Sequence, residues 1–277
     1  MLLRDIPYLE ELNIESCDIG STIIRSNVSI GPLSLRKVNC HLVSAKGIRK
    51  LIKTCPHIKE LTVTHLTSKE DRNKLLEEIT KSDLRLNKLN ISFFSYTETL
   101  LHLLQVQGRY LTHFTLWDVD QSVNIDSIVS IGTCCPNLNS LVLMTQSNHL
   151  FVPRFFKRPE KIFTELHSLT LGNENFNLGD ILLFFLQYAD KLQRLTLKYQ
   201  SKVNFDEILL SIIQKGYLKD ICYMWLDCTL EVNRRVVMKV IQSFDKLSDI
   251  TVDFTEDAVE IIYYIHDNNL DLKIGGY

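Results

Sequence analysis

The sequence predicts an α/β fold in which short parallel strands alternate with helices along a curved solenoid. Three observations lead to this prediction. An apolar pattern of the form Leu-x-x-Leu-x-Leu returns every 23–29 residues from Leu9 to Val252. Between its copies, apolar residues recur at i, i+3 and i+4, which is the spacing of one helix face. One such strand–helix unit cannot enclose a core alone, whereas a stack of units buries a continuous core.

The strands are predicted by three apolar positions that keep the same offsets in every copy. The clearest copy runs from Thr133 to Met144, where a helix end and a proline turn precede the strand. The first position falls at Leu9, Leu35, Ile58, Leu86, Leu111, Leu138, Leu166, Leu192, Leu218 and Leu247. The fourth falls at Leu12, Val38, Leu61, Leu89, Phe114, Leu141, Leu169, Leu195, Ile221 and Ile250. The sixth falls at Ile14, Cys40, Val63, Ile91, Leu116, Leu143, Leu171, Leu197, Tyr223 and Val252. All ten copies are apolar at all three positions, in a chain that is 45% hydrophobic.

The segments between the strands predict helices that each bury one apolar stripe against the strand row. The stripes are Ile48/Leu51/Ile52, Leu75/Ile79, Leu100/Leu103/Leu104, Ile125/Ile128/Val129, Leu182/Phe185/Leu186, Phe205/Ile208/Leu209/Ile212, Val237/Val240/Ile241/Phe244 and Val259/Ile262/Tyr263. Residues 151–163 contain two prolines, so we expect a short or broken helix there. Leu270–Ile274 predicts a further edge strand.

Composition describes a soluble globular chain without a specialised environment. The 277 residues carry a formal net charge of -2, and 23% of them are charged, so we expect neither nucleic acid nor a membrane as a partner. No apolar run approaches the roughly 18 residues that a membrane span needs. Seven cysteines, an odd number, with no export signal at the N-terminus favour reduced thiols in the cytoplasm or nucleus.

Catalytic signatures are missing from the sequence. It contains no phosphate-binding glycine loop, no Gly-x-Ser-x-Gly, no His-Glu-x-x-His and no Cys-x-x-Cys pair of the kind that binds zinc. His113 and Cys222 share the predicted inner face, but their strands are about 19 Å apart, too far for a nucleophile and its base. We therefore expect no enzyme, no metal and no cofactor.

Two junctions between helix and strand carry a family resemblance. Cys55-Pro56-His57-Ile58 and Cys135-Pro136-Asn137-Leu138, with the mean repeat of about 26 residues, resemble the cysteine-containing repeats of the F-box/leucine-rich-repeat family. The resemblance implies a leucine-rich-repeat horseshoe of about ten repeats with the parallel sheet on its concave face, forming one domain over residues 1–277. It further implies that the repeats recognise substrates for a Skp-cullin-F-box type ubiquitin ligase.

The F-box that precedes the repeats in that family is not visible here. We therefore expect the chain to be a truncated form of a longer protein whose missing N-terminal segment would contact the Skp–cullin components. The alternative function is that of a non-degradative regulator, which binds an enzyme and inhibits or activates it. The position three residues past the sixth place of each copy also departs from the family, which prefers Asn or Cys there. Only Cys17 matches, whereas Val43, Leu66 and Phe94 predict apolar packing at the turns.

The predicted inner face suggests where a protein partner binds. Side chains alternate along a strand, so residues between the buried positions line this face. Trp117 and Met144 fall in the same column of neighbouring strands, beside His113 and Val142, and we expect this group to be a binding hot spot. The alternative is that the loop above buries Trp117.

Two cations form a second candidate on the same face. Arg194 and Lys198 lie near Asp220, Asp249 and Asp253, and the pair is a candidate for binding an acidic segment or a phosphopeptide. The alternative is a surface whose charges neutralise one another. In the ninth copy, the pattern assigns Asp220, Cys222 and Met224 to the inner face.

Overall fold

A computed structural model describes residues 8–15, 34–66, 68–118, 122–145, 161–173, 178–199, 205–228, 233–252, 259–268 and 270–275. The chain divides into two compact units, each described here by itself. Unit 1 comprises Met1–Ser122 and Asp126–Leu138, and unit 2 comprises Val123–Ile125 and Asn139–Tyr277. In both units, strands that pair in parallel alternate with helices, which confirms the predicted α/β strand–helix repeat.

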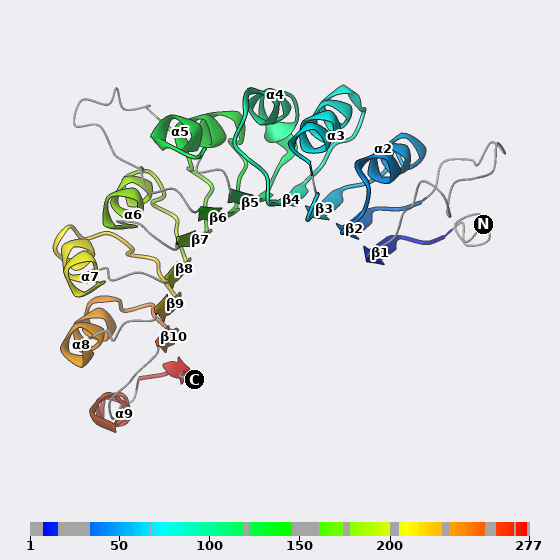
Figure 1. Ribbon diagram of the computed structural model, residues 1–277. Helices are drawn as coiled ribbons and strands as arrows, with labels where there is room; N and C mark the ends of the chain where they lie inside the picture. The colour runs from blue at the N-terminus through cyan, green and yellow to red at the C-terminus, as the bar shows by residue number, and fades with distance from the viewer. Residues whose placement is uncertain are drawn as a thin grey trace. The chain divides into compact units, whose positions relative to one another are not determined.

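Unit 1 contains the first strands of the chain, and each of them pairs in parallel with the next. They are β1 (Glu11–Glu15), β2 (Lys37–His41), β3 (Glu60–Thr64), β4 (Lys88–Ser92) and β5 (His113–Asp118). The helices are α2 (Ala45–Thr54), α3 (Lys69–Lys81), α4 (Glu98–Gln107) with the 3-10 turn η2 (Gly108–Tyr110), and α5 (Ile125–Cys134), whose first residue groups with unit 2. Helices α2, α3 and α4 lie on one side of these strands, which leaves the other side of the sheet open (Figure 1).

Unit 2 repeats this arrangement. Its strands are β6 (Ser140–Thr145), β7 (Ser168–Asn173), β8 (Arg194–Tyr199), β9 (Tyr223–Cys228), β10 (Asp249–Val252) and β11 (Lys273–Gly275), again paired in parallel in chain order. Its helices are α6 (Leu178–Leu186), α7 (Phe205–Gln214), α8 (Arg234–Ser243) and α9 (Val259–Asp267). Strand β11 overlaps the predicted segment Leu270–Ile274 at its last two residues and ends at Gly275, so a strand at this place is confirmed.

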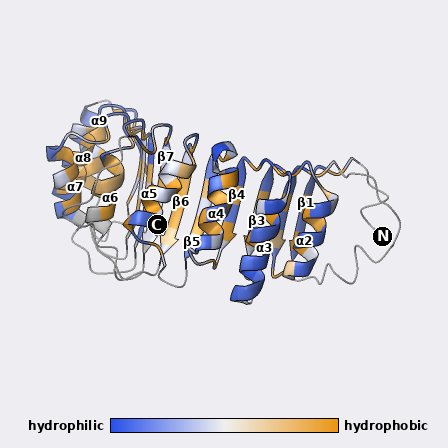
Figure 2. Cartoon of the chain, turned by 90° about the horizontal axis from the view of Figure 1, so that it is seen from above, coloured by the Kyte–Doolittle hydropathy of each residue, from blue (hydrophilic) through white to orange (hydrophobic). Residues whose placement is uncertain are grey.

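The core of each unit is built by the three apolar positions of the repeat. The pairing of β2 with β3 aligns Val38 with Leu61 and Cys40 with Val63, and all four side chains are buried. Because the register repeats from strand to strand, equal positions stack into continuous apolar columns. Fully burying one such side chain contributes about 1.5–3 kcal/mol. The helices present both hydrophobic and hydrophilic residues (Figure 2), as expected of elements that cover a core on one side only.

Side-chain caps define where several helices begin. Ser44 accepts a hydrogen bond from the Gly47 amide at α2, and Ser68 accepts one from the Asp71 amide at α3. Thr97 caps α4 in the same way. Each cap satisfies an amide that has no partner within its helix. At these three helices, the turn from strand to helix is therefore specified locally, by one short polar residue before the apolar stripe.

The Cys-Pro junctions mark the return from helix to strand. Cys55 and Cys135 are buried, and their carbonyls accept hydrogen bonds from the amides of Ile58 and Leu138 at 3.4 and 3.2 Å. A neighbouring turn packs closely against the second junction. A Cβ atom added to Gly108 would overlap the Cys134 carbonyl oxygen and lie 2.9 Å from Cys135 Sγ. Only glycine fits at position 108 without a shift of the backbone.

Apolar residues pack at the first turns after the strands. Val43, Leu66 and Phe94 are buried, which confirms the predicted apolar packing at these three turns. Cys17 and residues 146–160, which include most of the predicted broken helix, lie outside the described residues.

The predicted register of the ninth copy is wrong by three residues. Strand β9 aligns Met224 with Leu195 and Leu226 with Leu197, so the apolar triplet is Ile221, Met224 and Leu226. Leu218 instead occupies a left-handed turn with a φ of 63°. It comes after Gly216, which follows the end of α7. The segment from Leu218 to Tyr223 imitates the repeat because tyrosine counts as apolar.

The apolar stripe predicted for α9 is also wrong. Val259, Ile262 and Tyr263 are 44%, 55% and 64% exposed, whereas Ile261 is buried. The spacing of these apolar residues fits a helix, but it does not determine which side of the helix packs on the strands.

Replacing Gly108 with alanine should destabilise the protein by about 1–3 kcal/mol, because the new methyl group meets backbone that cannot rotate away. Chemical denaturation of the purified chain measures this change. Thr133→Ala, on the exposed side of α5, is the matched control and should change the free energy of unfolding by less than about 0.5 kcal/mol. Equal stabilities for Gly108→Ala and the unmodified chain would contradict this packing.

Candidate partner-binding surfaces

The open face of the sheet in unit 1 presents three columns of side chains. The column nearest the amino ends of the strands contains Glu11, Lys37, Glu60, Lys88 and His113. Opposite charges alternate along it, and Glu11 and Lys37 form an ion pair of 2.8 Å. The hydrogen bond to Lys37 holds the pKa of Glu11 below its ordinary value. This column is therefore close to neutral.

The other two columns are mainly uncharged. The middle column contains Asn13, Asn39, Thr62, Asn90 and Thr115. The Asn39 amide donates to the Asn13 side-chain oxygen. The third column contains Glu15, His41, Thr64, Ser92 and Trp117, and in it His41 Nδ1 lies 2.7 Å from Thr64 Oγ1. Amide and hydroxyl groups of this kind can bond to the backbone of another polypeptide.

Four rings form a continuous row at the carboxyl ends of the strands. This aromatic row consists of His41, His65, Phe93 and Trp117. Centroids of neighbouring rings are 4.9, 4.1 and 5.1 Å apart in that order, and Phe93 and Trp117 are stacked. Trp117 remains 37% exposed, and both histidines are exposed. The row therefore offers aromatic surface to solvent across four consecutive repeats.

A left-handed backbone brings part of this row into place. Leu42, His65 and Phe93 each follow a strand directly, and their φ angles are 53°, 59° and 65°. For a residue other than glycine this conformation costs roughly 1–2 kcal/mol. It occurs at the same position of three consecutive repeats, and Leu42 is 48% exposed. Such strain, repeated at residues that are exposed or half-buried, is typical of functional sites.

Hydrogen bonds hold the turns beneath the aromatic row. The Phe94 amide donates to the Trp117 carbonyl at 3.1 Å, and the Arg72 guanidinium of α3 donates to the Phe93 carbonyl. The buried carboxylate of Asp118 accepts from Ser122 Oγ at 2.8 Å, and Ser122 Oγ in turn accepts from the Tyr96 amide. These contacts tie the turn after β4 to the end of β5.

The residues predicted as one hot spot divide between the two units. Trp117 and His113 belong to unit 1, whereas Val142 and Met144 belong to unit 2. Burial, with a smaller effect of nearby Lys88, lowers the pKa of the exposed His113, whose Nδ1 lies 2.9 Å from Thr112 Oγ1. Val142 and Met144 are half-buried on the open face of β6, and the Met144 side chain lies over Gly172 of β7. Trp117 is exposed, so the alternative in which a loop covers it is wrong.

Each of the predicted cations Arg194 and Lys198 lies over an aromatic ring of β9. The Arg194 guanidinium is 4.2 Å from the Tyr223 ring centroid, and Lys198 Nζ is 4.9 Å from the Trp225 centroid. Such contacts contribute about 0.5–1 kcal/mol at exposed sites and restrict the cation. Tyr223 and Trp225 were missed on the open face because of the wrong register at the ninth copy.

The acidic residues around these cations differ from the prediction. Asp227 is aligned with Lys198, and Asp249 is aligned with Tyr223. Asp220 precedes β9 and forms an ion pair with Lys246, so it does not belong to the open face. Cys222 also precedes the strand, and Met224 is buried. Asp253 lies outside the described residues.

In the described part of the chain, the buried cysteines and the possible metal ligands do not favour thiol or metal chemistry. Burial raises the pKa of the Cys40 and Cys135 thiols to about 12 and that of Cys55 to about 11, which disfavours the reactive thiolate. Within the described ranges, no three His, Cys, Asp or Glu side chains group as metal ligands. None of the helices in those ranges has the length and apolar character to cross a membrane.

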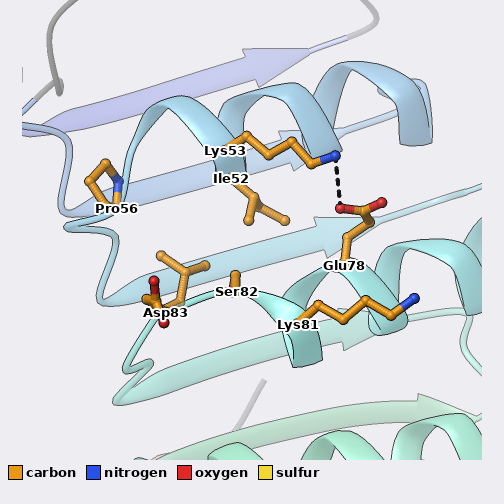
Figure 3. Close-up of a pocket in the computed structure, with 8 residues that line it drawn as sticks. Ile52, Lys53, Pro56, Glu78, Lys81, Ser82 and Asp83 are labelled. Carbon is orange, nitrogen blue, oxygen red and sulfur yellow. Dashed lines mark ion pairs between the residues drawn. The ribbon is translucent and has the colours of Figure 1, made fainter.

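A cleft of about 340 Å³ opens between α2 and α3, on the helix side of unit 1 (Figure 3). Ile52, Pro56 and Leu84 provide apolar lining. Lys53 and Glu78 form an ion pair of 3.2 Å beside it. Because this lysine and carboxylate neutralise one another, the cleft resembles a gap between packed helices more than a ligand site.

Comparisons with models of protein families and with curated proteins returned no match to this chain.

Substitutions at Leu42 test whether its backbone is strained. Leu42→Gly should be more stable than Leu42→Ala by about 0.5–1 kcal/mol, because only glycine adopts the left-handed conformation without steric cost. Both variants lose the leucine side chain, so denaturation curves for the pair isolate the backbone effect. At Lys46, an exposed position of helix α2, the order should reverse, with alanine more stable by about 1 kcal/mol. Alanine more stable than glycine at position 42 would rule out the strain.

Proposed function

We propose that this chain is a protein-binding module, that its strand–helix repeats are leucine-rich repeats, and that the aromatic row of unit 1 is part of its contact surface. The observation that supports this most strongly is the row itself, four neighbouring rings beside three exposed or half-buried residues in left-handed backbone. Exposed aromatic residues are enriched where protein interfaces concentrate their binding energy.

The size and charge of the surface favour a protein over other ligands. The three intervals between four neighbouring strands, at about 4.8 Å each, give the row a length of about 14 Å, more than a small metabolite covers. Beside it lie the near-neutral charged column and the amide and hydroxyl columns. Nucleic acids need a concentration of cations, which this face of unit 1 does not provide among its described residues. A polypeptide can use both the rings and the amides.

The finer proposal is substrate recognition for a Skp-cullin-F-box type ubiquitin ligase in the cytoplasm or nucleus. Its support is the resemblance of the Cys55-Pro56 and Cys135-Pro136 junctions to the cysteine-containing repeats of that family. The alternative, a regulator that binds and inhibits or activates an enzyme, would use the same surface. Both remain predictions. The ligase would also bind Skp and cullin, whereas the regulator would bind its enzyme without them.

Removing the exposed indole should weaken partner binding. A photo-crosslinking amino acid at Thr115, a half-buried position of β5 beside the row, first identifies the protein bound there in cells, and the same label at Lys46 on α2 reports background. For a partner captured only from position 115, Trp117→Ala should raise the dissociation constant about 30-fold, because a central aromatic anchor contributes about 2 kcal/mol or more. Titration calorimetry with the purified pair measures this.

Glu77→Ala, on the outer surface of α3, is the matched control and should leave the affinity within about twofold. If Trp117→Ala also stays within that range, the aromatic row is not the contact surface.

Recovery of associated proteins distinguishes the two finer functions. Immunoprecipitation of the full-length protein should recover Skp and cullin if it serves a ligase, and inhibition of the proteasome should then raise the amount of captured partner. Recovery of an enzyme whose activity changes on binding, without Skp or cullin, would instead establish the regulator.

A further inference from the structure

A basic edge lies at the opposite end of the unit 1 strands from the aromatic row. It consists of Arg36, Lys59, Arg85 and Arg109, in the turns that precede β2, β3, β4 and β5, and all four side chains are exposed. Backbone hydrogen bonds stack these turns. The Lys59 amide donates to the Arg36 carbonyl at 2.7 Å, and the Asn87 amide donates to the Lys59 carbonyl at 2.9 Å. The four turns are separated by three strand spacings of about 4.8 Å, so the edge spans about 14 Å.

The two arginines at one end of this edge are held together. Their guanidinium carbons lie 5.6 and 4.7 Å from the centroid of the same Tyr110 ring. Asn137 Nδ2 donates to the Arg109 carbonyl at 2.8 Å, and Lys59 Nζ donates to the Arg85 carbonyl at 3.4 Å. One ring therefore orients two like charges, with a third cation bonded to the same turn.

Acidic residues do not neutralise this edge. Elsewhere in unit 1, ion pairs engage Lys37, Lys53, Lys74 and Lys81. Among the described residues, none of the ion pairs involves the four cations of the basic edge. Two carboxylates lie in or next to these turns, that of Asp83 before β4 and that of Glu10 in the turn before β1. Four positive charges against two leave an excess that an anionic ligand would relieve.

We propose that the basic edge binds an acidic segment of a protein partner, whose carboxylates form ion pairs with the arginine and lysine side chains of the edge. The cations are spread over about 14 Å, which matches four to five residues of an extended chain at about 3.3 Å each and favours several charges over a single phosphate. A nucleic acid fits less well, because the charged column next to this edge contains acids as well as bases and the whole chain has a formal net charge of -2. The edge does not include the aromatic row, so this proposal holds or fails independently of the proposed function.

Fluorescence anisotropy with a synthetic peptide tests the proposal. The probe is a labelled peptide of repeated Gly-Glu-Glu, and repeated Gly-Gln-Gln is its neutral counterpart. The full chain should bind the Glu peptide at low salt and should not bind the Gln peptide. Arg85→Gln with Arg109→Gln should weaken binding about tenfold or more, and affinity should fall as salt rises.

The matched control removes two cations from another surface. Lys46→Gln with Arg49→Gln, on α2, makes the same change in net charge and should alter the affinity less than about twofold. Thermal melting confirms that both double variants fold. Trp117→Ala should leave the affinity for the Glu peptide unchanged, which separates this edge from the aromatic row.

Three outcomes would overturn the proposal. The first is an unmodified chain that does not bind the Glu peptide at low salt. The second is an equal loss of affinity in the two double variants, which would mean that only net charge matters. The third is a single-stranded RNA that binds more tightly than the Glu peptide and depends on Arg85 and Arg109, which would assign the edge to nucleic acid.

Discussion

The alternation of side chains along parallel strands is the constraint on which the rest of this structure depends. Once Val38 and Cys40 of β2 align with Leu61 and Val63 of β3, the residues between them must lie on the open side of the sheet. The hydrogen-bonded register carries this choice from each strand to the next. The buried columns hold a unit together, and by the same geometry the exposed columns line the open face of its sheet.

The fold was largely predictable because the apolar pattern that specifies its strands and helices returns at nearly constant intervals. Helices and strands appear where the apolar pattern places them, with polar caps such as Ser44 and Ser68 at the boundaries. The errors arose where the apolar spacing of the sequence and the observed packing disagree. Near Leu218, a turn residue and Tyr223 reproduce the apolar spacing by coincidence, and only strand pairing reveals the true register. In α9, the spacing is helical, but it does not show which side of the helix packs, and Ile261 is buried where Ile262 is exposed.

The candidate surfaces were predictable only in part. Alternation placed Trp117, Arg194 and Lys198 on the open face correctly. It did not predict that His65 and Phe93 join Trp117, because their side chains reach the row through a left-handed turn after the strand. Nor does spacing along the chain show that Arg85 and Arg109, 24 residues apart, converge on the ring of Tyr110. Contacts of this kind depend on turns whose backbone conformation leaves little trace in an apolar pattern.

The two tryptophans give each unit an optical reporter of its own. Trp117 stacks on Phe93 in unit 1, and Trp225 lies beneath Lys198 in unit 2, and the chain contains no other tryptophan. Replacing either indole with phenylalanine leaves tryptophan fluorescence, excited selectively over that of the tyrosines, that originates from one unit alone. The same chain, without an added label, can then show whether the two units unfold together or in sequence, and which of them responds when a ligand arrives.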